Sequence, residues 1–472
     1  MHHATLTLLL VPIGGGVLMA QTATSRLPDA PASQFIATED LAQVAPASAT
    51  QSAAPQTKSP SDTQHPTLTR AEAEQMAIKN NPRVSVGRLL ALAQHQVVRE
   101  TRAAELPTAT GSITAVEAED GTRIPAGSLT ASRLFTHAGA GGGFNQLLFD
   151  FGRTRNLVAS SKLQEKAQNA AALATTEDIV LATDQAFYNA LQAQTLLKVA
   201  QQNVATRNTT DVQVNEMTKN KLKSTLDLSF ADVSLSQAKL LLLDAQNNSD
   251  STMAALDAVL GLDHVVTYDL VENNAPLQPP PADATQLIQL GVQQRPDLQQ
   301  LNYSQQSAVK FSRAQRDQMF PTISAAGTAG SVPIRPAQYY TANWWGGIGV
   351  NMNIPIFNGF LYSAQAKEAA IRAEAASEQS RDLRDQIVRD IRMSWLAANT
   401  AFQRVSVTAE LLKQANLALD LAQTRYQMGL SSIVELSQAQ YQQTDAAIGN
   451  TNAQYQYKLA LATLNYQIGA TP

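Results

Sequence analysis

The chain has 472 residues, of which 16% are charged and 6% aromatic, and its formal net charge is −4 at pH 7. This charge gives no sign of the basic surface that is typical of nucleic-acid-binding proteins. The chain contains no cysteine, and its six histidines, apart from the adjacent His2 and His3, do not stand at metal-ligand spacing. The sequence therefore predicts neither a disulfide nor a metal site.

The first residues are typical of a targeting segment. Leu6–Ala20 is an apolar stretch with about the length of a secretory signal core, and it is too short to span a membrane. We interpret residues 1–20 as a signal peptide. Residues 21–66 are rich in Ala, Pro, Ser, Thr and Gln and predict a disordered linker, because such a segment buries too little apolar area to offset the entropy of ordering. No other apolar run reaches about 20 residues, so no transmembrane helix is predicted.

The remaining sequence contains one pattern twice. Pro82 and Pro107 recur 214 positions later as Pro296 and Pro321. Further along, a shift of 208 matches a second group of residues. This group is Phe149, Ser224, Leu228, Ser229, Ala231 and Gly261, which match Phe357, Ser432, Leu436, Ser437, Ala439 and Gly469. Two constant offsets predict two tandem structural repeats. Their predicted bounds are 67–261 and 283–469, with a linker at 262–282.

Each copy begins with a long predicted helix, Thr69–Glu105 in the first and Asp283–Met319 in the second. Thr69 followed by Glu72 is a capping box, and Asp283 with Gln286 is its near equivalent. The first proline of each copy predicts a break in the helix, because proline lacks the backbone donor. The second proline predicts the end of the helix and the start of an extended segment.

Two strands are predicted in the extended region of each copy. Residues 347–356 alternate between small or polar and large apolar residues, the period-two pattern of a strand with two unlike faces, and residues 140–146 show a weaker version. A half-buried strand of a soluble sheet would also alternate. A length of about ten residues, with Trp344 and Trp345 at one end as interface aromatics, favours a membrane β-strand. The partner strands are predicted at Thr108–Val116 and Thr322–Ser331.

Long runs without helix breakers follow the strands. Residues 153–260 contain no Gly and no Pro, and residues 360–468 contain only Gly429 and Gly449. Breaks near 219–224 and 428–432 divide each run into a helical hairpin. A helix of about 65 residues is about 100 Å long, too long for a globular core. Such helices must pack side by side as a coiled-coil-like tube or a solid rod, and periodicity alone does not distinguish the two.

Four strands in one chain cannot close a barrel. An open strand edge in lipid costs several kcal/mol for each unsatisfied backbone group, so several chains would have to pool their strands. Two chains give eight strands with a filled interior, whereas three give twelve and leave room for a pore. The predicted fold class is α+β and mostly α: a trimeric twelve-stranded membrane β-barrel continued by a long α-helical barrel.

Several segments resemble the TolC family of outer-membrane efflux channels. Residues 425–440, RYQMGLSSIVELSQAQ, are similar to the hairpin-turn signature of that family. Residues 355–359 and 148–152 resemble its strand-to-helix junction, and residues 68–82 resemble its opening helix. The resemblance extends over residues 67–469, nearly the whole of the chain after the predicted linker.

The resemblance implies a homotrimer in the outer membrane whose helices extend into the periplasm as a tunnel. It implies that the hairpin tips close this tunnel at rest and dock a periplasmic adaptor protein, which connects to an inner-membrane pump. The expected function is a passive exit duct of a tripartite efflux or secretion system, in contact with outer-membrane lipid and without a cofactor.

The resemblance also implies roles for residues at the second tip. Arg425 and Tyr426 match the pair before the turn, where polar contacts with the neighbouring hairpin help to hold the gate. Gly429, Leu430 and Ser431 match the turn that meets the adaptor.

The first tip departs from this pattern, since its matching residues are Lys221, Leu222 and Lys223. These lysines either contact an acidic patch on the adaptor or form a soluble cap. Asp227 and Glu435 match a region where the family can carry an inward acidic residue. A ring of three carboxylates at a pore mouth would favour cations, and a solvated helix face is the alternative for both residues.

A periplasmic helical-hairpin scaffold or adaptor without a pore is the alternative function. An adaptor would be expected to show one hairpin between β-rich halves, whereas this chain predicts two hairpins and two strand pairs. An enzyme is not expected, because the sequence contains no nucleophile elbow, phosphate loop or zinc-binding helix motif. No catalytic residue is therefore assigned.

Overall fold

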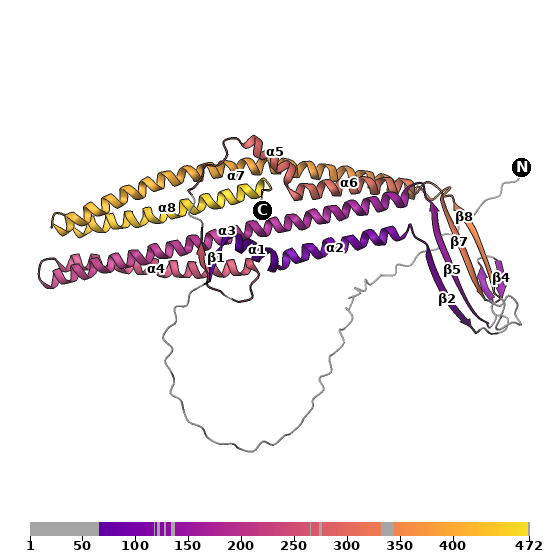
Figure 1. The fold of residues 1–472 in the computed structure, drawn as a ribbon, viewed down its shortest axis with the longest axis horizontal. Helices are drawn as coiled ribbons and strands as arrows, with labels where there is room; N and C mark the ends of the chain where they lie inside the picture. The colour runs from indigo at the N-terminus through magenta and orange to yellow at the C-terminus, as the bar shows by residue number, and fades with distance from the viewer. Residues whose placement is uncertain are drawn as a thin grey trace, which may run out of the picture. The chain divides into compact units, whose positions relative to one another are not determined.

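Long helices and a four-stranded sheet make up the part of the chain that the structure describes (Figure 1). The computed structural model describes residues 66–117, 119, 123–126, 129–133, 137–264, 266–272, 276–331 and 344–470. The predicted signal peptide and the predicted linker up to residue 65 lie outside these ranges. The described residues all belong to one unit, Gln64–Pro472.

The same order of elements occurs in both halves of this unit. Helices of 11 and 22 residues come first: α1 (Arg70–Asn80) and α2 (Pro82–Ala103), then α5 (Ala284–Gln294) and α6 (Pro296–Asp317). Two strands of the four-stranded sheet and a pair of long helices follow each time.

The helix breaks predicted at the first prolines are confirmed. Asn81 and Arg295 have extended backbone, with ψ of 124° and 123°, and Pro82 and Pro296 begin the next helix. A proline forces the residue before it out of the α conformation, yet it suits the first turn of a helix, where no donor is needed. Asn81 Oδ1 accepts a hydrogen bond from Arg83 N at 2.9 Å and so caps the new helix.

The two predicted capping boxes have different outcomes. At α1 the box is confirmed, since Thr69 Oγ1 accepts from Glu72 N at 3.4 Å and the Glu72 carboxylate accepts from Thr69 N at 2.9 Å. At α5 the cap is confirmed but the box is wrong. Asp283 accepts from Thr285 N at 2.8 Å, and Gln286 returns no bond to the cap. The Asp283 side chain accepts its hydrogen bond from the second helical residue, Thr285, and Gln286 takes no part in the cap.

Four antiparallel strands form one sheet in the order β2-β5-β7-β8 (Figure 1). Their bounds are Thr108–Val116 for β2, His137–Phe149 for β5, Thr322–Ser331 for β7 and Trp345–Asn353 for β8. The predicted bounds of β2 and β7 are confirmed, and each strand starts directly after a proline, Pro107 or Pro321. The preceding helices end earlier than predicted, at Ala103 and Asp317.

Strand β8 lies earlier in the chain than predicted. It begins at Trp345 and ends at Asn353, so residues 354–356 lie outside it although their apolar alternation continues. Asn353 pairs with Thr322, the first residue of β7, and the partner strand extends no further. Pro355 also lacks the donor that a strand ladder needs.

Two further strand pairs were not predicted. β3 (Arg123–Ala126) and β4 (Leu129–Arg133) form a hairpin between β2 and β5, and β1 (Thr67–Thr69) pairs in parallel with β6 (Asp269–Val271). These strands have three to five residues, too few for a clear period-two pattern. The β1–β6 pair ties the start of the first half to the segment between the halves.

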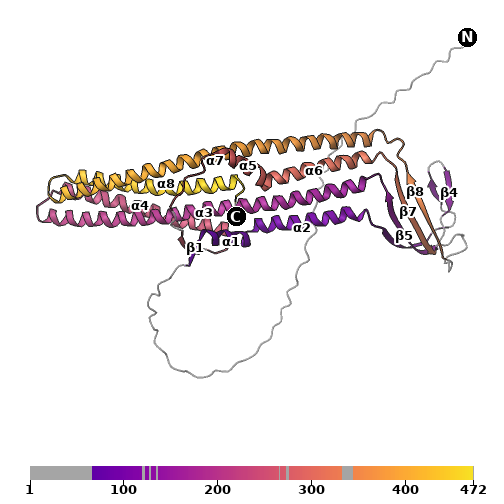
Figure 2. The ribbon, with the colours of Figure 1, turned by 45° about the horizontal axis from the view of Figure 1, so that its top comes forward.

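Each half ends in a helical hairpin, as predicted. α3 (Arg153–Lys219) and α7 (Leu361–Gln427) have 67 residues each, which at 1.5 Å per residue is about 100 Å. α4 (Thr225–Leu260) and α8 (Ile433–Gln467) return alongside them. Both views show these helices side by side (Figure 1, Figure 2).

A pair of left-handed residues turns each half from strand into long helix. The pair is Phe151 and Gly152 before α3, with φ of 55° and 97°, and Gly359 and Phe360 before α7, with φ of 64° and 66°. A phenylalanine in this conformation costs about 1–2 kcal/mol. In the first half, stacking of the Phe151 ring on Phe320 at a centroid separation of 5.4 Å offsets part of that cost.

Polar side chains join the two halves along α3 and α8. Hydrogen bonds recur along the length of this interface. One apolar cluster lies around α1, α3 and α4 and also includes Tyr455 of α8, and another lies around α5, α7 and α8. The bonded pairs include Asp178–Tyr466 (2.5 Å), Gln192–Asn452 (2.7 Å), Thr195–Tyr455 (3.1 Å), Asn203–Thr444 (3.2 Å) and Thr210–Gln440 (3.2 Å).

Two buried carboxylates share one arginine where α1 packs on α3. Arg70 Nη1 lies 2.9 Å from Glu74 Oε1 and 3.1 Å from Asp184 Oδ2. Glu74 is 6% exposed and Asp184 is 5% exposed. Burial, together with the hydrogen bond and charge of Asp184, raises the pKa of Glu74 to about 7, although Arg70 acts in the opposite direction.

Glu74→Gln is expected to reduce the pH dependence of stability. The pKa of Glu74 is about 7 in the folded chain, above its value in the unfolded chain, so the folded state binds the proton more tightly. The stability from protonated Glu74 is complete below the unfolded pKa of about 4.3 and is lost as the pH rises toward 7. Melting temperatures across this range should fall more steeply for the native chain than for the variant. The exposed Glu374→Gln should follow the native curve, and equal slopes for all three proteins would contradict the assignment.

Gly261→Ala is expected to destabilise the first half. Gly261 follows α4 with φ of 74°, and a Cβ there would lie 2.9 Å from Asn80 O, a backbone atom that cannot rotate away. We expect a loss of about 2 kcal/mol or more from the left-handed strain and this contact together, measured by urea unfolding. Gly449→Ala is the matched control, since its Cβ would meet open space and alanine favours a helix interior by about 1 kcal/mol. A neutral Gly261→Ala would contradict the close contact.

Candidate functional site at the hairpin tips and the sheet

The two hairpin tips share one backbone geometry. In the first, Lys221 has φ of 58° and Leu222 N donates to a carbonyl of the last helical turn at 2.8 Å. In the second, Gly429 has φ of 73° and Leu430 N makes the same bond, also at 2.8 Å. This is the Schellman ending of a helix, whose left-handed residue is usually glycine. The lysine in the first tip therefore keeps the same turn, at a cost of about 1 kcal/mol.

Each tip presents large apolar side chains to solvent. Leu222 is 73% exposed, its counterpart Leu430 is 67% exposed, and Met428 beside Leu430 is 66% exposed. Both turns lie at the end of the long helices that is away from the sheet (Figure 2). Apolar groups gathered at one end of rigid hairpins mark a candidate surface for contact with another protein.

Tyr426 joins the second tip to the first hairpin. It is 6% exposed and belongs to one cluster with Val214 of α3 and Ala231 of α4. The Lys223 ammonium lies 4.4 Å from the centre of the Tyr426 ring, a cation–π contact. Burial raises the pKa of Tyr426, and the charge of Asp227 adds to this effect. The Tyr426 hydroxyl has no hydrogen-bond partner among the described residues.

Arg425 forms an ion pair across its own turn. Its Nε lies 3.3 Å from Glu435 Oε1, and the two side chains are 56% and 45% exposed. Such an exposed pair contributes at most about 1 kcal/mol, and it stays within the second hairpin. In the same turn, the Ser431 hydroxyl is buried and has no partner within the described ranges.

The two predicted acidic residues both lie near the start of a helix. Asp227 Oδ2 accepts from Ser224 N at 3.1 Å and completes a capping box at α4. Glu435 N donates to Ser432 Oγ at 3.4 Å at the start of α8, while the Glu435 carboxylate pairs with Arg425. Each carboxylate thus stabilises its own hairpin, in addition to any role at a pore mouth.

The structure brings some of the predicted tip residues together across the hairpins. Tyr426 meets Lys223, although they are far apart in sequence, and sequence reasoning did not find this contact. The buried positions near the end of α7 are Ala415, Ala422 and Tyr426. Their spacing of seven and four residues is that of one helix face, and it could have indicated that the tyrosine is buried.

The sheet has one polar and one apolar face. Directly paired residues share a face, so Thr110, Gly143, Thr328 and Gly347 lie on one side. Thr, Ser, Asn and small residues predominate on that side. The other side carries most of the large apolar residues of the sheet, which are exposed in the single chain: Ile113, Phe144, Ile348, Val350 and Met352.

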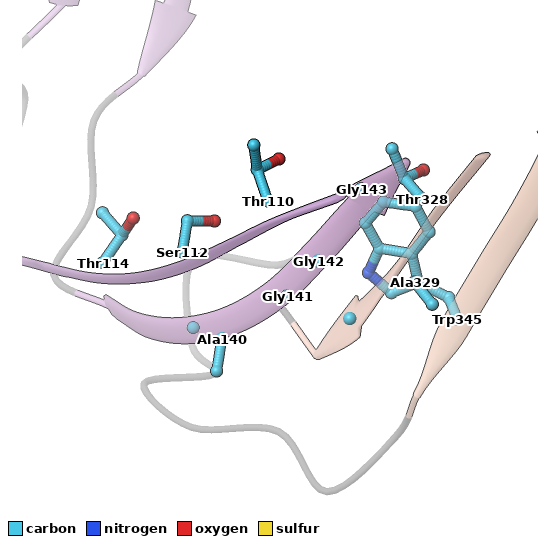
Figure 3. A pocket seen from close by; sticks show the side chains of 12 residues that line it. Thr110, Ser112, Thr114, Ala140, Gly141, Gly142, Gly143, Thr328, Ala329 and Trp345 are labelled. Atoms are coloured by element: carbon cyan, nitrogen blue, oxygen red, sulfur yellow. The ribbon is translucent and has the colours of Figure 1, made fainter. Parts of the chain in front are cut away.

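A hollow of about 420 Å³ lies over the polar face. Thr110, Ser112 and Thr114 project from one side of β2 near the glycines of β5 (Figure 3). The glycines leave space and the hydroxyls make it polar. Trp345 also lines the hollow, and it is 48% exposed, while the adjacent Trp344 is 72% exposed.

Both outer strands of the sheet have a free edge within the described residues. β2 pairs only with β5, and β8 pairs only with β7. Every residue of β8 and all but the last residue of β2 are exposed. A free edge presents unpaired N–H and C=O groups that can pair with another strand.

No helix within the described ranges combines the length and the apolar character that crossing a membrane requires. In the same part of the chain, no three His, Asp or Glu side chains are grouped so that they could hold a metal ion.

Known proteins match the chain in both sequence and fold. A family model described as outer membrane efflux protein matches residues 73–262 and again residues 287–470. The chain is 26% identical over 347 residues to the outer membrane protein TolC of Escherichia coli (strain K12), which covers 68% of this chain and 69% of TolC. It is 24% identical over 371 residues to the outer membrane efflux protein BepC of Brucella suis, which covers 77% of each protein.

A solved structure has a similar fold. The CmeC outer membrane channel of Campylobacter jejuni matches with a TM-score of 0.74 and 18% identity, over 85% of each chain. The family model includes both halves of the described unit, so the resemblance to TolC stated from the sequence is confirmed. The chain belongs to the outer membrane efflux protein family, and it is an efflux protein of the outer membrane.

Proposed function

We propose that three copies of this chain form a passive exit duct. Twelve strands, four from each chain, close a β-barrel, and the long helices continue it as an α-helical barrel into the periplasm. The observation that carries the proposal is the four-stranded sheet with two free edges. In lipid each unsatisfied edge group costs several kcal/mol, so β2 of one copy pairs with β8 of the next. Three copies leave a lumen that two would fill with side chains.

The two faces of the sheet support this arrangement. The apolar face with Ile113, Ile348 and Val350 fits contact with lipid, and the polar face with its hollow fits a water-filled lumen. Trp344 stands beside one end of β8, where an aromatic side chain suits a membrane interface. Trp345 lines the hollow on the polar face and would therefore face the lumen, which departs from the interface role expected from the sequence.

Exposed apolar side chains along the helices also support an assembly of several chains. Side chains of this kind on α4 and α7 gain apolar contacts when neighbouring copies cover them. They include Leu240 (62% exposed), Leu243 (60%), Val407 (68%), Leu411 (54%) and Leu421 (65%).

The proposed organisation of the chain follows the sequence repeats. It consists of a signal peptide at 1–20, a linker at 21–66, and repeats at 67–261 and 283–469 that are connected by residues 262–282. The matching element order and equal lengths of α3 and α7 support this division. Two hairpins per chain would place six tips at one mouth of the tunnel.

The tips are proposed to gate the tunnel and to dock a periplasmic adaptor that leads to an inner-membrane pump. The exposed Leu222 and Leu430 would contact the adaptor together with Lys221, Gly429 and their neighbours. Arg425 and Tyr426 would hold the gate, and Asp227 and Glu435 would line its mouth. Adaptor binding that favours the open form would shift a two-state equilibrium, so the duct itself needs no energy source.

A scaffold or adaptor without a pore is the less favoured function. A rod-like scaffold explains long hairpins, but it does not explain a sheet with large exposed apolar side chains on one face and two free edges. An enzyme is also at odds with the relatives, which are named as outer membrane and efflux proteins.

Paired cysteines test the ring directly, because the chain contains no cysteine of its own. Ser112→Cys in β2 combined with Gly349→Cys in β8 puts thiols at opposite edges of the sheet on the same face. Oxidation in outer membranes is expected to give a ladder of bands that ends at a covalent trimer on non-reducing gels. Pairs of Ser112→Cys with Gly347→Cys or Asn351→Cys sample neighbouring registers. Each single variant should stay monomeric, and a monomer band alone in all three pairs would count against the ring.

Arg425→Ser combined with Tyr426→Phe is expected to raise single-channel conductance in planar bilayers. The change removes the polar groups proposed to hold the tips together, while the phenyl ring keeps the packing of Tyr426 against the first hairpin. Arg381→Ser is the control on the same helix, since it breaks another exposed ion pair, with Glu378, far from the tip. The gate assignment is wrong if the double variant conducts like the control.

A further inference from the structure

A cavity of about 280 Å³, lined by both polar and apolar side chains, lies between α3, α7 and α8, above the tips and away from every predicted site. Its lining is neutral except for Arg207, and it includes the amides of Asn203 and Gln440 and the hydroxyl of Thr444. A second hollow of about 310 Å³ lies on the α4 side and shares Arg207, Asn203 and Thr444. Arg207 therefore stands between two spaces where three or more helices meet.

Arg207 is buried, at 7% exposed, and its charge has no carboxylate partner in the described part of the chain. Its bonds go to neutral acceptors. Nη1 donates to Ser234 Oγ and to Gln440 Oε1, both at 2.6 Å, and Nε donates to Asn203 Oδ1 at 3.1 Å. Nη2 has no partner among the described residues.

The unpaired charge is costly where it stands. Burial lowers the pKa of Arg207, yet a guanidinium does not lose its proton in proteins, so the cation stays charged. Burying an ion that lacks a counter-charge carries a desolvation penalty. Three neutral acceptors compensate part of it, and the free Nη2 group leaves two donors unused.

We propose that the first cavity is a binding site for a small inorganic anion, held by Arg207 Nη2 and the Asn203 amide. Both groups can donate, and within the described ranges the Asn203 Nδ2 atom makes no other bond. The second hollow carries Asp445 in its lining, and this carboxylate would repel an anion. The site is therefore assigned to the cavity bounded by α7 and α8. Its volume accommodates an ion of chloride to phosphate size with a few waters.

The bound anion would fasten the two hairpins of one chain to each other. Arg207 belongs to α3, Ser234 to α4 and Gln440 to α8, so its hydrogen bonds already connect both hairpins. An anion that neutralises the guanidinium strengthens this junction and makes the stability of the helical part depend on the kind of anion present. This inference does not depend on the exit-duct proposal, because all the groups lie within one chain.

The test is the melting temperature of the purified full chain in detergent, measured in sodium chloride, sulfate and phosphate against sodium gluconate at equal ionic strength. The native protein is expected to gain about 2 °C or more, saturably, with a small anion. Arg207→Gln should show no such gain. Arg404→Gln is the matched control, since exposed Arg404 also donates to a glutamine of α8, Gln456, at 3.1 Å, and it should keep the native response.

Bromide soaking of crystals gives a second readout that does not depend on stability. An anomalous peak beside the Arg207 guanidinium is expected in the native protein and in Arg404→Gln, and it should be absent in Arg207→Gln. A native protein with no anion-specific gain and no peak overturns the proposal, as would happen if a carboxylate of a neighbouring copy filled the cavity. An equal gain in Arg207→Gln overturns it as well.

Discussion

Backbone hydrogen bonding at the two edges of the four-stranded sheet is the constraint on which the rest of the molecule depends. The helices satisfy their backbone hydrogen bonds internally, so even helices of 67 residues need no backbone hydrogen bonds from another segment. The strands cannot, because β2 and β8 each leave a row of donors and acceptors free. Lipid offers no substitute for these bonds. In the proposed ring, a single chain is an incomplete fold at one end, and neighbouring copies would also cover the apolar side chains that are exposed along its helices.

The helical part is held by a different balance of forces. Many buried positions on α3 and α7 are alanine, which allows helices to approach closely. Between the halves, hydrogen bonds of the α3–α8 interface supply contacts that depend on register. Neutral pairs such as Gln192 with Asn452 add little net stability each, but they lose a partner if one helix slides. Such an interface fixes the alignment of the hairpins more than it adds to their stability.

Local signals in the sequence predicted the helices, strands and turns well, but they did not predict contacts between residues that are far apart in the sequence. Pro82, Pro107 and the turn around Gly429 act through neighbouring backbone, so the helix breaks, the starts of β2 and β7 and the tips could be read directly. The end of β8 depends on where β7 begins, and the alternation around Pro355 does not reveal that. At the tips, the sequence indicated Tyr426 but not its packing on Lys223. Arg207 could not be found, because its acceptors Ser234 and Gln440 come from two other helices.

The strand-to-helix junctions have a consequence for symmetry. Phenylalanine precedes glycine in one junction and follows it in the other, so the two left-handed positions are the same but the rings are displaced by one residue. In both junctions the left-handed phenylalanine contacts a phenylalanine of its own segment, Phe149 at 4.8 Å in the first and Phe357 at 5.7 Å in the second. In the first junction Phe151 also stacks on Phe320. Around the proposed ring of three chains, junctions with the additional Phe320 contact would alternate with junctions that lack an equivalent contact. The six strand-to-helix junctions between the β-barrel and the helical barrel would then include three that bend more easily. The ring at this level would deform most easily into a triangular outline.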